Sequence, residues 1–227
     1  RQLILLSLIV VGTLVLGKAA HYISAFAAPL AAGALLTAIL IDSRVGLLVS
    51  AVLALLYGVI ADNNLRAVMA MLLGGVTGVY SVAKLLHGYS LTTAGIWIAA
   101  VNFLVICATG FVEQLPSLTI LGQGVLGAIS GVAAAVITTG LLPYLENAFN
   151  IATPVKLLDL AKPTHPLMQQ LLLEAPGTYH HSVLVGNMAE AAAGAVGADP
   201  ITVRVGAYYH DIGKIKRPMF FIENQVG

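Results

Sequence analysis

Long uncharged apolar runs alternate with short polar breaks over the first 143 residues of the chain. A helix needs about 20 largely apolar residues to cross a bilayer, because it must satisfy its backbone polar groups within the segment. The pattern therefore predicts six spans: Leu3–Gly17, Ala25–Ile41, Val45–Ala61, Leu65–Ala83, Leu91–Val112 and Leu118–Leu142. Since the breaks are of hairpin length, we expect consecutive spans to pack antiparallel.

Composition agrees with a membrane protein and excludes several other classes. Of the 227 residues, 59% are hydrophobic and 9% are charged, whereas soluble domains carry about 25% charged residues. Cys107 is the single cysteine, so no disulfide scaffold is present, and the net charge of +1 gives no argument for a nucleic acid polymer as partner. Eight charged residues lie in 1–143 and thirteen in 144–227, which predicts a boundary near Pro143–Tyr144 and a tail that faces water.

The spans carry few polar features, and each has a structural interpretation. Asn102 is expected to form an interhelical hydrogen bond, and the glycines of 74–78 and 122–124 are expected to allow close helix packing. We find no ionisable residue well inside a run, so this half is interpreted as an anchor or sensor rather than a pump. With six spans, the positive-inside rule favours a cytoplasmic tail: Arg1, Arg44, Lys84, Lys156 and Lys162 share its side, against Lys18 and Arg66.

The tail predicts a series of amphipathic helices with clear start and stop signals. Thr153-Pro154 and Asp199-Pro200 each provide an N-cap and a first-turn proline, and Gly197 suits a helix terminator. One helix is expected to open at His180 or His181 and run to about Val196, and the next to run through Ile212. Antiparallel packing of these two helices would bring the histidine pair next to His210-Asp211.

That juxtaposition indicates metal chemistry. His210 and Asp211, adjacent on a helix, would point about 100° apart and could bind the same metal site from neighbouring directions. Imidazole and carboxylate suit iron or manganese as well as zinc, and two metals can clamp a phosphate and activate water for phosphoester hydrolysis. The alternative is a His-Asp pair that merely caps and bridges helices.

The motifs around these residues resemble a known family. His181-Ser182 followed by His210-Asp211-Ile212-Gly213-Lys214 is similar to the HD-domain metal-dependent phosphohydrolases. The longer strings over 174–182, 204–211 and 220–225 resemble the seven-transmembrane HD phosphohydrolases of the PgpH type. The resemblance implies an all-α fold, with a polytopic transmembrane helix bundle (1–143), a helical linker (144–176) and the N-terminal part of a cytoplasmic HD domain (177–227). It also implies hydrolysis of cyclic di-AMP to pApA, with an extracellular sensor domain upstream.

The same resemblance assigns roles to individual residues. His181, His210 and Asp211 become metal ligands, with Asp211 also catalytic as a bridging carboxylate. Lys214 becomes a catalytic or substrate-binding residue that contacts phosphate or keeps Asp211 ionised, and His180 an outer contact to ligand or substrate. The implied cofactors are two divalent transition metal ions, iron or manganese ahead of zinc.

The remaining implications concern partners and completeness. We expect a multi-pass protein of the cell membrane whose partners are a cyclic dinucleotide, the lipid bilayer and a second copy of the chain. Because an HD domain continues beyond residue 227 with further ligands, the 227 residues alone are expected to be inactive or severely impaired. The span count differs from the seven of the family. The alternatives are an HD enzyme for another nucleotide or phosphoester, and a non-enzymatic receptor or transporter with a regulatory tail.

Overall fold

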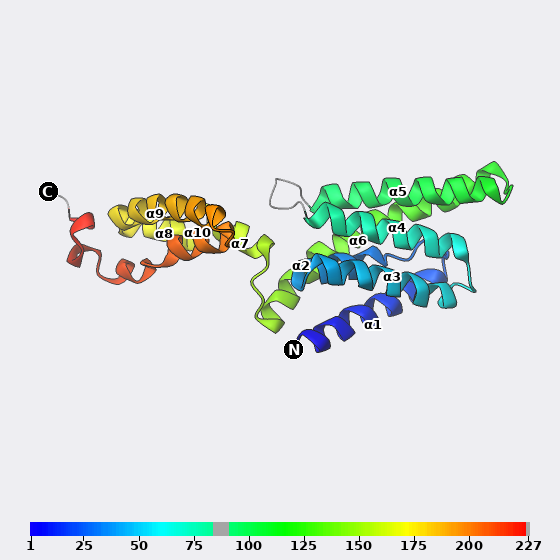
Figure 1. The fold of residues 1–227 in the computed structure, drawn as a ribbon, viewed down its shortest axis with the longest axis horizontal. Coiled ribbons are helices and arrows are strands. Elements are labelled where there is room, and N and C mark those ends of the chain that lie inside the picture. Colours follow the sequence, from blue (N-terminus) through cyan, green and yellow to red (C-terminus); the bar gives the residue numbers. More distant parts are fainter. Residues whose placement is uncertain (84–90, 226–227) are drawn as a thin grey trace. The chain divides into compact units, whose positions relative to one another are not determined.

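The computed structural model describes residues 1–83 and 91–225, and throughout these ranges the regular structure is helical. The chain forms two compact units, Arg1–Ile151 and Ala152–Gly227 (Figure 1). The expectation of an all-α fold is confirmed. The last long helix continues past Pro143, where the sequence predicted a domain boundary, and ends at Phe149. The domain limits 1–143, 144–176 and 177–227 stay predictions.

The first unit is a bundle of long apolar helices. Its elements are α1 (Gln2–His21), α2 (Ala31–Leu40), α3 (Ser43–Ile60), α4 (Leu65–Ala83), α5 (Leu91–Val112) and α6 (Ser117–Phe149). All of these except α2 are long and apolar enough to cross a membrane, which makes five candidate spans among the described residues. Neighbours in sequence pack against one another, most extensively α5 with α6 and α4 with α5. The predicted break at 84–90, with Lys84, lies outside the described residues.

The second predicted span is the one that the structure corrects. Only Ala31–Leu40 of the expected Ala25–Ile41 is helical, because Pro29 lacks an N–H and disfavours helical backbone at the residue before it. The non-helical segment 22–30 still runs alongside α3, since the Tyr57 hydroxyl donates to the carbonyl oxygen of Ala25 at 2.9 Å. Every residue of α2 is buried, so this short helix packs against protein on all sides.

Close helix contacts in the bundle depend on small residues, as expected for helices in lipid. A Cβ added at Gly74 would contact Asn102, and one added at Gly124 would contact Phe103. A Cβ added at Gly122 would have no neighbour within 4 Å. Packing therefore explains the first two glycines but not Gly122. The predicted interhelical role of Asn102 is confirmed, because its Nδ2 donates to the Gly127 carbonyl oxygen at 3.2 Å and to a serine on α6 at 3.3 Å.

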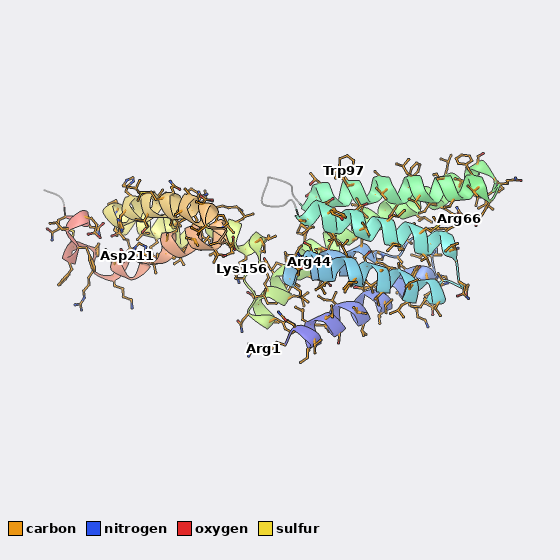
Figure 2. The ribbon with its side chains drawn as sticks, in the orientation of Figure 1. Arg1, Arg44, Arg66, Trp97, Lys156 and Asp211 are labelled. Carbon is orange, nitrogen blue, oxygen red and sulfur yellow. The ribbon has the colours of Figure 1, made fainter. Side chains whose placement is uncertain are left out.

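One ionisable side chain lies deeper in the bundle than the sequence suggested. Arg66, at the start of α4, is 7% exposed and donates from Nη2 to the Ile106 carbonyl oxygen at 3.0 Å and from Nε to Thr109 at 3.2 Å. Its Nη1 lies 3.4 Å from Glu113 Oε2. Arg1 and Arg44 lie at the opposite end of the bundle from Arg66 (Figure 2), as expected for loops on opposite faces of a membrane.

The second unit consists of shorter helices. They are α7 (Pro154–Leu160), α8 (Pro166–Glu174), α9 (Pro176–Ala195) and α10 (Pro200–Tyr209), followed by the 3₁₀ turns η2 (Ile212–Lys216), η3 (Pro218–Phe220) and η4 (Ile222–Asn224). Thr153 and Asp199 cap α7 and α10 by accepting backbone N–H bonds, and Gly197 follows α9 with φ +75°. These three start and stop signals are confirmed.

Packing of α9 against α10 sets the geometry on which the site depends. Gly186 of α9 lies against the ring of Tyr208, where a larger residue would overlap that ring. Arg204 crosses back to α9 through an ion pair with Glu190 at 3.1 Å, and its Nε donates to the Tyr208 hydroxyl at 2.8 Å. The contact is therefore fixed by shape and by charge.

Candidate metal centre

His181 projects from the second turn of α9, which begins earlier than the sequence predicted. The helix starts at Pro176 rather than at His180 or His181, because a proline occupies a first helical position at no cost in hydrogen bonds. His181 is exposed, while the next residue, Ser182, is fully buried. One face of the helix is therefore buried in the core, and His181 lies on the exposed side next to that face.

His210 and Asp211 follow α10 instead of lying within it. The helix ends at Tyr209 and His210 is its C-cap residue, so the predicted continuation to Ile212 is wrong, and the argument from a 100° helical spacing does not apply. Nδ1 of His210 lies 2.7 Å from the Ala207 carbonyl oxygen. Because a carbonyl oxygen only accepts, Nδ1 carries the proton and Nε2 is the atom left to bind a ligand.

Nε2 of His210 faces a carboxylate. It lies 3.2 Å from Asp211 Oδ2, and if the ring is neutral these two atoms are both acceptors. Two ligands about 2.1 Å from one metal ion are about 3.0–3.4 Å apart at octahedral to tetrahedral angles. The separation therefore suits two atoms that share a cation.

His181 completes the group. Its ring centroid lies 5.6 Å from that of His210, and each of His181, His210 and Asp211 offers a ligand atom within 4.8 Å of the others. The predicted meeting of these three residues at one point is confirmed, and Asp211 marks its place in Figure 2. Two imidazole nitrogens and a carboxylate oxygen are a donor set for iron, manganese or zinc. The residues present therefore fit a divalent metal.

Lys214 lies between two carboxylates. Its Nζ is 2.8 Å from Asp211 Oδ2 and 2.7 Å from Glu223 Oε1, and it lies over the Phe221 ring at 4.7 Å. The bonds to Asp211 and then to Glu223 raise the pKa of Lys214, and the lysine in turn lowers the pKa of Glu223. Lys214 thus stays charged next to the candidate ligand Asp211.

Glu223 is a site residue that the sequence argument missed. It reaches the site because η4 packs on the first turn of α9, where Asn224 Oδ1 accepts from the Thr178 backbone N–H at 3.0 Å. Asn224 Nδ2 donates to the Thr178 hydroxyl at 2.8 Å, and that hydroxyl donates to Glu223 at 3.1 Å. The only sequence signal was the string 220–225, which supported the family resemblance without indicating a contact 45 residues away.

His180 does not join the group. Its ring packs edge-on against Tyr179 at 5.6 Å, and it is exposed on α9. Lys216 and Arg217 lie nearby in sequence, with Arg217 over the Phe220 ring at 5.7 Å. The outer role of His180 and the catalytic roles of Asp211 and Lys214 stay predictions.

Comparison with known proteins agrees with this geometry. A family model described as 7TM receptor with intracellular HD hydrolase matches residues 1–153, and an HD domain model matches residues 178–226. No solved structure gives a significant match.

Curated relatives cover most of the chain. The cyclic-di-AMP phosphodiesterase PgpH of Bacillus subtilis is 40% identical over 206 residues, which is 87% of this chain and 29% of that protein. The protein of the same name from Listeria monocytogenes is 37% identical over 69% of this chain and 22% of its own length. An uncharacterised protein of Synechocystis is 34% identical over 74% of this chain and 21% of its own. The chain thus spans under a third of each relative, and it belongs to the family of 7TM receptors with an intracellular HD hydrolase.

Proposed function

We propose that the protein containing this chain is a membrane-anchored, metal-dependent phosphodiesterase that hydrolyses cyclic di-AMP to pApA under control of its membrane domain. The observation that carries the proposal is the group of His181, His210 and Asp211, whose ligand atoms lie within 4.8 Å of one another. Two relatives that match most of the chain are named cyclic-di-AMP phosphodiesterases, which supports the choice of substrate.

His181, His210 and Asp211 would hold the metal. A bound divalent metal supplies a Lewis acid for phosphate oxygens and a water of lowered pKa. His210 is oriented for ligation by its Nδ1 bond to the Ala207 carbonyl oxygen, the kind of outer contact that fixes the tautomer of a metal ligand. The ammonium of Lys214 pairs with Asp211 Oδ2 at 2.8 Å and would help to hold that side chain in place.

Lys214 has a further role in the proposal. The Lys214 side chain is 20% exposed, and its Nζ lies beside the three candidate ligands. It can therefore face a substrate phosphate, while its ion pair with Glu223 limits how far it can move. An ammonium in this place favours the anionic diester and the charge that develops on its oxygens. His180, one residue before a ligand, is proposed as an outer contact to substrate.

Number and identity of the metals belong to the proposal as well. Three side chains suffice for one ion, and a second ion would need further ligands. Two divalent ions, iron or manganese ahead of zinc, are proposed from the resemblance to the HD-domain phosphohydrolases, and the imidazole and carboxylate set suits all three metals. The tail is proposed to be cytoplasmic, as the end of the bundle with Arg1 and Arg44 agrees with the positive-inside rule. We also propose that the whole protein forms a homodimer.

The test uses the full-length protein in detergent or nanodiscs. We expect His210→Ala and Asp211→Asn each to lower hydrolysis of cyclic di-AMP at least about 100-fold and to lower bound metal, because each removes a ligand. Asp159→Asn is the matched control, since that carboxylate is exposed and forms a surface ion pair with Lys162 at 2.8 Å. Cyclic di-GMP and linear dinucleotides tested in parallel separate the proposed substrate from another phosphoester. Undiminished turnover in both ligand variants would refute the site.

A further inference from the structure

The hydroxyl of Tyr209 joins three elements of the second unit. Its oxygen lies 2.8 Å from the Leu160 carbonyl oxygen and 3.0 Å from His165 Nδ1. A phenolic hydroxyl has one proton, and the carbonyl can only accept it, so the hydroxyl donates to Leu160 and accepts from the Nδ1–H of His165. The two rings meet edge to face, with centroids 6.0 Å apart and planes at 89°.

The partners of Tyr209 are helix ends. Leu160 is the last residue of α7, and the last four carbonyls of a helix have no partner within it. His165 is the N-cap residue of α8, yet its side chain makes no capping bond to that helix. The Tyr209 hydroxyl therefore satisfies a terminal carbonyl of α7 and holds the start of α8, while its own backbone is the last residue of α10.

The position of Tyr209 in the chain gives this contact its consequence. The next two residues are His210 and Asp211, the candidate ligands that α10 delivers to the site. On its other side, α7 packs on α10 and follows α6 in sequence after only residues 150–153. The segment that leaves the last apolar helix is thus bonded to the residue that directly precedes the ligands.

We propose that Tyr209 is a positioning residue, whose bonds to Leu160 and His165 set the place of His210 and Asp211 and carry displacements of α7 to them. The inference rests on the proposed function for its activity readout. A movement of α7 along its axis pulls on the Leu160 carbonyl, and through the hydroxyl on the end of α10. Rigid coupling of this kind requires a direct bond, because a loose contact would let α7 slide without moving the ligands.

Two tyrosines next to each other provide a matched pair of variants. Tyr209→Phe removes the hydroxyl and keeps the ring against His165. Tyr208→Phe removes a hydroxyl from the neighbouring residue, which bonds to Arg204 and faces α9 instead of α7. In the full-length protein we expect Tyr209→Phe to lower kcat about 5- to 10-fold with KM within twofold, as loss of one or two hydrogen bonds permits, and Tyr208→Phe to change kcat less than twofold.

His165 provides a second pair. Asparagine places an amide near the position of Nδ1 and can still donate to the Tyr209 hydroxyl, whereas alanine cannot. We expect His165→Ala to reproduce the loss of kcat and His165→Asn to retain most of it. The double variant of Tyr209→Phe with His165→Ala should have a kcat within about twofold of the less active single variant, because both substitutions remove the same hydrogen bond.

Two readouts do not depend on turnover. The visible spectrum of the Co²⁺-loaded protein reports ligand geometry, and we expect Tyr209→Phe to change it at unchanged metal content. Hydrogen exchange of the backbone amides over 157–161 should quicken in the same variant, because α7 loses its terminal partner. Failure of wild-type protein to cleave cyclic di-AMP would refute the proposed function and leave these two readouts as the test. A kcat, spectrum and exchange rate that match those of Tyr208→Phe would overturn the assignment of Tyr209.

Discussion

Gly177→Ala is expected to detach η4 from α9 and disturb the surroundings of Lys214. A Cβ at this position would overlap the backbone carbonyl of Glu223, and backbone cannot move aside as a flexible side chain can. The whole turn has to retreat. Asn224 then loses its bonds to the Thr178 N–H at 3.0 Å and to the Thr178 hydroxyl at 2.8 Å, and Glu223 loses its bond from the same hydroxyl.

The magnitude follows from those bonds. Two or three hydrogen bonds of about 1 kcal/mol each give a loss of about 2–3 kcal/mol for docking of the turn, or a change of about 30- to 150-fold in its opening equilibrium. Alanine raises intrinsic helix stability over glycine by up to about 1 kcal/mol, but that gain acts on α9 and not on its contact with η4. The expected net effect is therefore a local loss.

The assay is hydrogen exchange at Asn224 and Gln225, whose backbone N–H groups bond within the turn to Phe221 at 3.0 Å and Ile222 at 3.1 Å. Exchange of these amides should quicken by the stated factor in Gly177→Ala. Gly206→Ala is the matched control, because it lies inside α10 with nothing within 4 Å of an added Cβ. If exchange at the turn changes less than threefold in Gly177→Ala, both the predicted clash with Glu223 and the role of the Thr178 bonds in holding η4 are wrong.

Three further predictions address other parts of the molecule. Gly131→Ala places a Cβ 2.5 Å from the backbone nitrogen of Ala99, so it should separate α5 from α6 and destabilise the bundle by about 1–3 kcal/mol in unfolding from detergent. Asn102→Ala should cost only about 1 kcal/mol in the same assay, although the residue is 2% exposed, because hydrogen bonds between membrane helices average about 0.6 kcal/mol; a loss above 3 kcal/mol would contradict this. Lys214 lowers the pKa of Glu223 below its ordinary 4.5, so the contribution of this pair to stability is present above pH 4.5 and is lost as pH falls through the lowered value. The Asn224 amide shift in an NMR titration from pH 6 to 3 should follow that loss, and Glu223→Gln should abolish the response.

Features encoded by near neighbours in sequence were predictable. The caps at Thr153 and Asp199 and the terminator at Gly197 depend on backbone geometry within a few residues, and the structure contains all three. Proline was harder to interpret, because one residue both ends a helix and begins the next. The sequence predicted the start of α9 at His180 or His181, whereas Pro176 opens the helix and places His181 in its second turn.

Hydropathy could not distinguish the two environments that a buried apolar segment meets. The run over 25–41 is as apolar as a lipid-facing span, and yet α2 is enclosed by protein. Arg66 was missed for a related reason, since its place next to a polar break suggested solvent. The structure instead turns its side chain inward, where the Phe26 ring lies 5.2 Å from the guanidinium carbon and Thr109 accepts a hydrogen bond.

The candidate site divides in the same way. His181, His210 and Asp211 could be predicted because antiparallel helices joined by a short turn bring the start of one next to the end of the other. Glu223 could not be predicted, because its approach depends on the docking of η4 onto α9 through Asn224, a contact that no periodicity encodes.

The interrupted segment before α3 has a consequence for membrane insertion of the chain. A lone stretch with the backbone of 22–30 would carry unpaired carbonyls into hydrocarbon, and each of them costs several kcal/mol there. The Tyr57 hydroxyl, which pairs with the Ala25 carbonyl, is contributed by a helix synthesised later. The Ala25 carbonyl therefore gains this partner only once α3 has been made, which ties the packing of this segment to α3.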